Sequence, residues 1–368
     1  MTEAMQLPGW SLRPLFEVAT LQRGYDLPVQ DRTDGAFPIY AANGPVGCHG
    51  SAKCRAPGVV TGRSGTIGKV HYVEGDYWPL NTSLYVKDFH GNNPRWSYYM
   101  LQSFGLDRFA QGAGVPTLNR NLVHGEQISV PPVTEQRRIA AILDKADTLR
   151  TKRREALAQL DRLAQAIFVE MFGDPTAFTQ KPLQNLCDLI TDGTHQTPTY
   201  ADEGTIFLSA KNVTSGQIDW VNVKYVPPSL HAELHARLAP RIGDILLAKN
   251  GTTGVAAVVD RNEVIDIYVS LALLRPKADV LPAYLLAAIN SPLCTRQFSG
   301  ALKGIGVPNL HLKDIRQTTI PYPPLQAQRQ FTARLKALES IRTSTRNAML
   351  ATTAMFAAIQ QRAFQGEL

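Results

Sequence analysis

Two glycine-rich segments carry polar and basic side chains that could bind a nucleic acid. One spans residues 62–69 and the other spans residues 248–254. Glycine lets the backbone approach a phosphate closely, and backbone N–H groups can donate to phosphate oxygens. Arg and Lys neutralise phosphate or bind guanine O6 and N7, whereas Asn binds adenine N6 and N7. The candidate contact residues in these segments are Arg63, Ser64, Thr66, Lys69, Lys249, Asn250 and Thr252.

A plain β-hairpin turn with solvated polar residues would show the same pattern in either segment alone. The recurrence of the pattern at matching places in the chain is what favours binding. Side chains of the same chemistry occur elsewhere, and each could equally lie on a solvated surface. They are Asn119, Arg120, Lys211, Asn212 and Lys303.

Motifs for catalysis are missing from the sequence. It contains no G-x-x-x-x-G-K-[ST] phosphate loop, no H-E-x-x-H and no G-x-S-x-G. The four cysteines do not have zinc-finger spacing and are expected to be reduced thiols. We therefore predict no catalytic residue, no metal and no cofactor. An enzyme whose site is assembled from distant residues stays an alternative.

An internal repeat organises the chain. The string Gly114–Leu118 returns as residues 306–310, a shift of 192 that also maps Gln136-Arg137 onto Gln328-Arg329 without a gap. A looser similarity relates Gly65–Gly68 to Gly251–Gly254 upstream. The downstream blocks are similar between the two copies, which suggests a scaffold. The upstream regions have diverged between the copies, which suggests two variable binding domains.

The downstream blocks have helical periodicity. Apolar residues recur at steps of three and four from Ile139 to Met171 and from Phe331 to Ala363. Pro-Pro precedes each block and marks the helix entry. Helices of about 30 to 35 residues would be roughly 50 Å long and could not bury their apolar stripes alone. We predict an antiparallel coiled coil, with two separate helices folded back on their own domains as the alternative. The aromatic and sulfur side chains expected in its core are Phe168, Met171, Phe172, Met355 and Phe356.

The upstream regions read as short strands between Gly, Pro and Asn, with a few helical stretches such as 96–109 and 282–289. The predicted fold class is α+β: two mixed α/β domains separated by two long antiparallel helices, with a pseudo-twofold internal repeat. The expected segments are a first domain at 1–132, a helix at 133–173, a second domain at 174–323 and a helix at 324–368.

Composition is compatible with this picture. The 368 residues are enough for two domains, and a net charge of +7 permits a polyanionic partner without requiring one. The first residues lack a basic segment followed by an apolar run, and no stretch approaches about 20 apolar residues. The expected compartment is therefore the cytoplasm, with no membrane partner.

Several strings resemble the specificity subunits of type I restriction–modification systems, along essentially the whole chain. Residues 37–40, 61–68 and 78–84 look like one type of target-recognition domain of that family, and 191–198 look like another. Residues 130–137 and 323–328 look like the junctions between those domains and their helices, although Ala327 replaces the acidic residue found at Glu135.

The resemblance implies a non-catalytic subunit whose two recognition domains each read one half of a split double-stranded DNA target. The helices would set the length of the unread spacer. Two modification subunits that bind S-adenosylmethionine and methylate adenine would dock around them, and restriction subunits would add translocation and cleavage. A coiled-coil scaffold with incidental DNA binding is the alternative.

Overall fold

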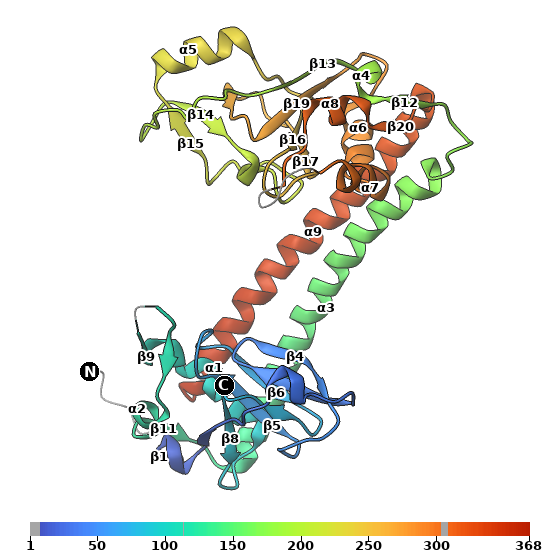
Figure 1. Ribbon diagram of the computed structural model, residues 1–368. Coiled ribbons are helices and arrows are strands. Elements are labelled where there is room, and N and C mark those ends of the chain that lie inside the picture. Colours follow the sequence, from blue (N-terminus) through green and yellow to red (C-terminus); the bar gives the residue numbers. More distant parts are fainter. Residues whose placement is uncertain (1–7, 113, 303–307) are drawn as a thin grey trace. The chain divides into compact units, whose positions relative to one another are not determined.

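The fold repeats one unit twice, as the computed structural model shows (Figure 1). The structure describes residues 8–112, 114–302 and 308–368. Unit 1 consists of residues up to 154 together with 346–368, and unit 2 consists of residues 155–345. Each unit holds one α/β domain and half of each long helix, α3 (Val133–Phe172) and α9 (Leu325–Phe364).

Unit 1 is built around an antiparallel sheet in the order β2-β8-β5-β6. Beside it lies a sheet in the order β4-β3-β7, in which β3 and β7 are parallel. A third pair, β1 with β11, closes the domain next to α3. The strands are β1 (Ser11–Pro14), β2 (Thr20–Arg23), β3 (Phe37–Ala41), β4 (Gly44–His49), β5 (Gly58–Gly62), β6 (Val70–Val73), β7 (Trp78–Pro79), β8 (Ser83–Asp88), β9 (Ala110–Gln111), β10 (Thr117–Leu118) and β11 (Gln127–Val130).

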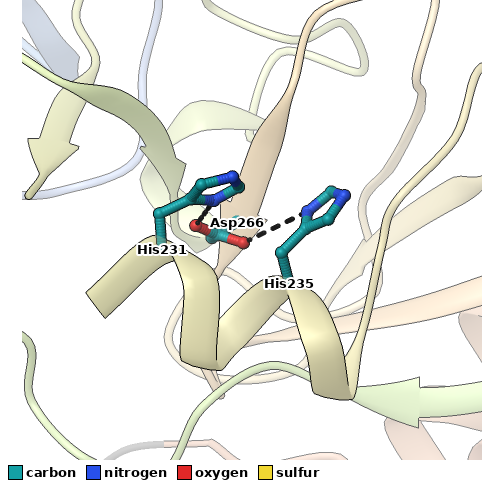
Figure 2. Close-up of side chains that lie close together, drawn as sticks. All are labelled: His231, His235 and Asp266. Atoms are coloured by element: carbon teal, nitrogen blue, oxygen red, sulfur yellow. Dashed lines mark hydrogen bonds and ion pairs between the residues drawn. The ribbon is translucent and has the colours of Figure 1, made fainter. Parts of the chain in front are cut away.

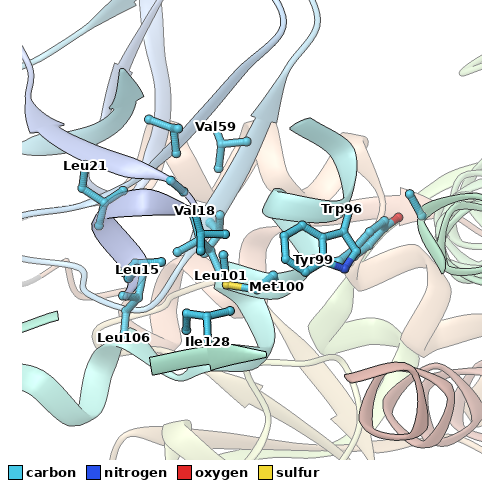
Figure 3. Packing of buried hydrophobic residues seen from close by; sticks show 14 of the residues in the cluster. Leu15, Val18, Leu21, Val59, Trp96, Tyr99, Met100, Leu101, Leu106 and Ile128 are labelled. Atoms are coloured by element: carbon cyan, nitrogen blue, oxygen red, sulfur yellow. The ribbon is translucent and has the colours of Figure 1, made fainter. Parts of the chain in front are cut away.

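The core of unit 1 forms where α1 (Pro94–Phe104) packs on the first sheet. Trp96 and Tyr99 of this helix are fully buried among Leu15, Val18 and Val59 (Figure 3). Short helices η1 (Leu15–Glu17), η3 (Leu106–Phe109) and α2 (Arg120–His124) complete the domain, and η2 (Val29–Asp31) lies outside this core. The helical stretch expected at 96–109 is thus α1 followed by η3, because Gly105 breaks it with φ +70°.

Unit 2 repeats this topology with different residues. Its sheets have the orders β13-β19-β16-β17 and β15-β14-β18, and β14 and β18 are parallel. The strands are β12 (Gln180–Pro182), β13 (Cys187–Asp192), β14 (Thr205–Leu208), β15 (Lys224–Val226), β16 (Ile245–Ala248), β17 (Ala256–Val258), β18 (Ile265–Ile267), β19 (Leu271–Pro276) and β20 (Thr319–Pro321). The helices are α4 (Leu183–Leu186), η4 (Ala210–Asn212), α5 (Pro228–Arg237), α6 (Pro282–Ile289), α7 (Pro292–Ala301) and α8 (Leu312–Gln317).

Strand by strand, β2, β8, β5 and β6 correspond to β13, β19, β16 and β17. The smaller sheets and the pairs β1–β11 and β12–β20 correspond in the same way. The predicted duplication is therefore confirmed, and it extends through the upstream domains, where the sequences share little.

Two buried glutamines secure the long helices to the domains in equivalent ways. The Gln136 Oε1 accepts from the backbone N–H of Asn93, the N-cap of α1, at 2.8 Å. The Gln328 Oε1 accepts from the backbone N–H of Leu281, the N-cap of α6, also at 2.8 Å. Each amide nitrogen donates to a proline carbonyl at 3.0 Å, that of Pro131 or Pro323. The repeated glutamine thus has one structural role in both units.

The long helices are antiparallel, as predicted. In unit 1, Ile139 and Leu143 near the start of α3 share a core with Phe356 and Ala363 near the end of α9. In unit 2 the order is reversed, because Phe168 and Phe172 at the end of α3 pack on Phe331 at the start of α9, with ring centroids 5.8 and 5.4 Å apart. Each helix has 40 residues, more than expected, and is about 60 Å long.

The expected continuous apolar seam is not fully buried. Leu149, Leu163, Ile341 and Met355 are 39 to 55% exposed, and Met355 was wrongly placed in the core. Packing is dense where a domain covers the helix pair. Two helices alone shield only a narrow stripe from water, which leaves apolar side chains exposed in the middle. In the described part of the chain, no helix combines the length and apolarity that crossing a bilayer demands.

Candidate nucleic-acid interface

The two glycine-rich segments are equivalent hairpin loops. Residues 63–69 join β5 to β6, and residues 249–255 join β16 to β17. Gly65 and Gly251 take positive φ values of +92° and +75°, a backbone region that strains residues with a Cβ. Each loop therefore turns at a residue whose backbone conformation only glycine adopts readily.

Each loop is bonded to the string that recurs without a gap in the sequence. In unit 1, Gly65 N–H donates to the Pro116 carbonyl and Leu118 N–H donates to the Arg63 carbonyl, both at 2.8 Å. In unit 2, Gly251 N–H donates to the Pro308 carbonyl at 3.2 Å, and Leu310 N–H to the Lys249 carbonyl at 2.8 Å.

These bonds bring Ser64 opposite Thr117 and Asn250 opposite Asn309, each pair forming a β-bridge. The backbone framework is thus the same in both units, whereas the side chains on it differ.

In unit 1 the loop residues lie at different depths. Ser64 and Thr66 are half-buried and Lys69 is exposed. Arg63 is half-buried, and its Nε donates to the carbonyl of Asn81 at 2.8 Å. The Asn81 amide donates to Asp26, which also pairs with Arg23 at 3.2 Å.

The sequence reasoning missed Arg23, Asp26 and Asn81. Asn81 lies in a string that carried the family resemblance, but only the fold shows that it holds Arg63.

In unit 2 the equivalent of Arg63 is buried. The Lys249 Nζ lies 2.7 Å from the Asp192 Oδ2, and the two side chains are only 10 and 7% exposed. Burial opposes the ionisation of Asp192, but the hydrogen bond and the charge of Lys249 outweigh it and lower the pKa of that carboxyl. Lys249 therefore pairs with a protein carboxylate in this structure, and its expected role as a DNA contact stays a prediction.

Two further side chains, which we had not selected as candidates, surround Asp192. His195 Nε2 lies 3.3 Å and the Arg237 guanidinium 3.8 Å from Asp192 Oδ1. They are 68 and 50% exposed, so each presents a polar group to solvent beside the loop.

Asn212 is also buried, and its side chain is hydrogen-bonded within the protein. It is 7% exposed, its Oδ1 accepts from Ser209 N–H at 2.9 Å, and its Nδ2 donates to the Asn222 carbonyl at 3.0 Å. Lys211 beside it is exposed. Ser270 bonds both to η4, through Ala210 N–H, and to Lys249 N–H. Lys211 therefore lies on a segment that shares Ser270 with the hairpin loop.

The remaining candidates flank the loops. Asn119 and Arg120 are exposed and follow directly after β10, which holds Thr117 opposite Ser64. Asn119 caps α2 by accepting from Asn121 N–H at 3.0 Å, and Arg120 donates to the Leu21 carbonyl at 3.4 Å. Asn250 and Thr252 lie on the unit 2 loop, half-buried and exposed respectively. Lys303 lies outside the described residues.

The structure thus gathers Arg63, Ser64, Thr66, Lys69, Asn119 and Arg120 around one hairpin, and Lys211, Asn250 and Thr252 around the other. These surfaces offer donors and acceptors of the kinds that bind phosphates and base edges. In both, a buried or half-buried cation is held by fixed protein oxygens beneath the loop.

Two curated relatives of this chain are specificity subunits of type I restriction enzymes. The chain is 22% identical over 268 residues to the type I restriction enzyme MjaVIII specificity subunit of Methanocaldococcus jannaschii, covering 67% of this chain and 63% of that one. It is 21% identical over 313 residues to the EcoBI specificity subunit of Escherichia coli, covering 75 and 66%. The alignments thus span slightly less than two thirds of these relatives' lengths.

Solved structures show the same fold. The type I restriction–modification S subunit from M. genitalium superposes with a TM-score of 0.54 at 14% identity, over 99% of this chain and 98% of that one. A chain from a structure concerned with complex assembly and conformational transition of the type I R-M system gives 0.60 at 19% identity, over 99% of both.

The family described as "Type I restriction modification DNA specificity domain" matches the sequence twice, over residues 8–160 and 199–351. Each match combines most of one α/β domain with part of a long helix. Since the two matches together cover most of the chain, this protein belongs to the type I restriction–modification DNA specificity domain family.

Proposed function

We propose that the chain is the DNA-specificity subunit of a type I restriction–modification complex, in which each unit reads one half of a bipartite target. The observation that carries this proposal is the duplicated framework with exchanged side chains. Arg63 and Ser64 in unit 1 correspond to Lys249 and Asn250 in unit 2, on loops held by equivalent backbone bonds. Two different sequences can be read only if equivalent positions carry different chemistry.

The proposed contacts are side chains of the loops and their flanks that are exposed or half-buried. Lys69, Arg120 and Lys211 would neutralise phosphates and position each unit on the duplex. Asn250 and Thr252 in unit 2, and Ser64 and Thr66 in unit 1, would face base edges. Lys249 and Asn212 would support this surface indirectly, by holding the loop and the adjoining η4 in place.

The chemical reactions on the DNA would be carried out by partner subunits. We propose that two modification subunits, which use S-adenosylmethionine to methylate adenine, dock on the long helices and that restriction subunits join them. The exposed apolar side chains of the helices support such docking. Leu163 and Val169 on α3 and Leu350 on α9 are 47 to 61% exposed. Large apolar side chains that are exposed together along an element commonly mark a protein interface.

Exchange of one recognition domain tests the proposal. Residues 176–323 are replaced by the equivalent region of a relative, the variant is expressed with its modification subunits, and methylated adenines are mapped across the genome. One half of the methylated sequence should change and the other should persist. The reciprocal exchange of residues 8–132 is the matched control and should change the other half. Change of both halves, or of neither, in these variants would contradict the modular assignment.

A salt titration distinguishes this function from a coiled-coil scaffold with incidental DNA binding. The logarithm of the DNA association constant should fall with the logarithm of salt concentration by about 0.9 for each phosphate contacted. The affinity for the mapped target should also exceed that for a scrambled duplex at every salt concentration. Equal affinity for both duplexes would favour the scaffold.

A further inference from the structure

A cluster of two histidines and one aspartate lies on α5 and β18 of unit 2, outside the hairpin loop surface. His231 and His235 are one turn apart on α5, so their side chains lie on the same face of the helix. Both face Asp266, in the middle of β18 (Figure 2). The three residues offer ligand atoms that all lie within 4.8 Å of one another.

The contacts within the cluster are only partly satisfied. His231 Nδ1 lies 2.8 Å from Asp266 Oδ2, a hydrogen bond. His235 Nδ1 lies 3.7 Å from Asp266 Oδ1, and neither atom has a hydrogen-bond partner within the described ranges. An unpartnered oxygen on a side chain that is 1% exposed is costly, because burial removes its hydration without replacement.

A cation would remove this cost. It would supply the partner that the buried Asp266 Oδ1 lacks among the described residues. Arg237, the one arginine of α5, donates to the carbonyls of Gly193 and Asp192.

We propose that His231, His235 and Asp266 bind one divalent transition-metal ion of the zinc class. Two imidazole nitrogens, one carboxylate oxygen and a water form a familiar four-coordinate donor set. Bonds of about 2.0 to 2.2 Å in a tetrahedron place the ligand atoms roughly 3.2 to 3.6 Å apart. The three candidate ligand atoms lie within 4.8 Å of one another, so side-chain rotations would have to draw them together to this spacing.

The consequence would be structural. None of the ten residues of α5 is buried, so the helix has little apolar anchorage of its own. The ion would join α5 to β18 and fix the segment between β15 and β16. Because β16 leads into the hairpin loop of unit 2, the metal would also limit the motion of that part of the domain. This inference does not depend on the proposed function.

The full-length chain, purified in the presence of a chelator and then freed of it, is titrated with Co²⁺. Wild type should bind one equivalent and develop the visible absorption of a low-coordinate cobalt site, which Zn²⁺ then abolishes by competition. Zn²⁺ in excess should raise the midpoint of thermal unfolding by several degrees, because it binds only the folded state.

His235→Ala is the decisive variant, because His235 Nδ1 makes no hydrogen bond with the described residues and lies 3.7 Å from Asp266, so its loss should leave the fold intact. Cobalt affinity should fall by more than about 100-fold, beyond the loss typical of an outer-shell change. Asp266→Asn should behave alike, and the exposed His311→Gln should bind as wild type does. If wild type binds no cobalt, or if His235→Ala binds it equally well at a site elsewhere such as Cys48, the inference is overturned.

Discussion

Replacing Lys249 by Met tests whether this residue supports the recognition surface or belongs to it. The ammonium group lies 2.7 Å from Asp192, and both side chains are almost fully buried. Met keeps most of the apolar volume of lysine but removes its charge. The substitution therefore leaves the Asp192 carboxylate in a poorly hydrated place without its closest cation.

The expected cost follows from the remaining neighbours. Breaking a buried ion pair by removing one partner typically costs about 3 to 5 kcal/mol. His195 and Arg237 still lie 3.3 and 3.8 Å from Asp192, but both are at least half exposed, so solvent weakens their effect. We expect unit 2 to lose about 2 to 3 kcal/mol, which corresponds to roughly 30- to 150-fold faster opening at fixed closing rate.

Native-state amide hydrogen exchange measures this loss unit by unit. Peptides from β13 and β16 should exchange faster in Lys249→Met, whereas peptides from β5 and β8 of unit 1 serve as the internal control. Arg63→Ala is the matched variant, and because Arg63 donates one hydrogen bond to Asn81 it should cost unit 1 only about 1 kcal/mol. Adding Asp192→Asn to Lys249→Met removes the stranded charge and should restore much of the stability.

The pH dependence has a definite sign. A folded-state pKa of Asp192 below its ordinary value means that the ion pair stabilises the protein above about pH 4. That contribution disappears as the pH falls through the folded-state pKa, because the carboxylate is then protonated. Without its cation, Asp192 in Lys249→Met becomes protonated at a higher pH than in wild type, so the difference between the two proteins should be largest near neutrality and shrink steadily as the pH falls.

A different result would refute the reasoning. If exchange in β13 and β16 is unchanged while DNA affinity falls equally for all sequences and the salt slope decreases by about 0.9, Lys249 is a phosphate contact. That outcome would require the Lys249 side chain to leave Asp192 when DNA binds.

Two further predictions concern the scaffold. Gln136→Leu and Gln328→Leu each remove three hydrogen bonds and leave the backbone N–H of a helix N-cap residue without its acceptor. Each variant should therefore destabilise its own unit by about 2 to 4 kcal/mol. Hydrogen exchange at α1 and α6 measures this loss, and an effect on the other unit would contradict the equivalence of the two glutamines. One heptad inserted into both α3 and α9 at the boundary between the units adds about 10 Å of helix, which should widen the unread DNA spacer by about 3 base pairs in methylation maps. An unchanged spacer would reject a measuring role for the helices.

The sequence by itself determined the duplication, the two long helices and the two glycine hairpins. These features leave local marks: an ungapped shift of 192 residues, apolar residues at helical spacing, and glycines where the backbone takes positive φ. The recurrence of Gln136 and Gln328 was visible as well, although their partners, 43 and 47 residues away, could not be named.

Only the tertiary structure decided which polar residues face solvent and which are internal. Lys249 and Asn212 looked like contact residues, but Asp192 is 57 residues away from the first, and the fold alone brings them together. The same holds for Asn81 beneath Arg63 and for Asp266 beside the two histidines. The physical reason is that burial and ion pairing depend on neighbours distant in sequence, whereas periodicity and turn chemistry depend on neighbours along the chain.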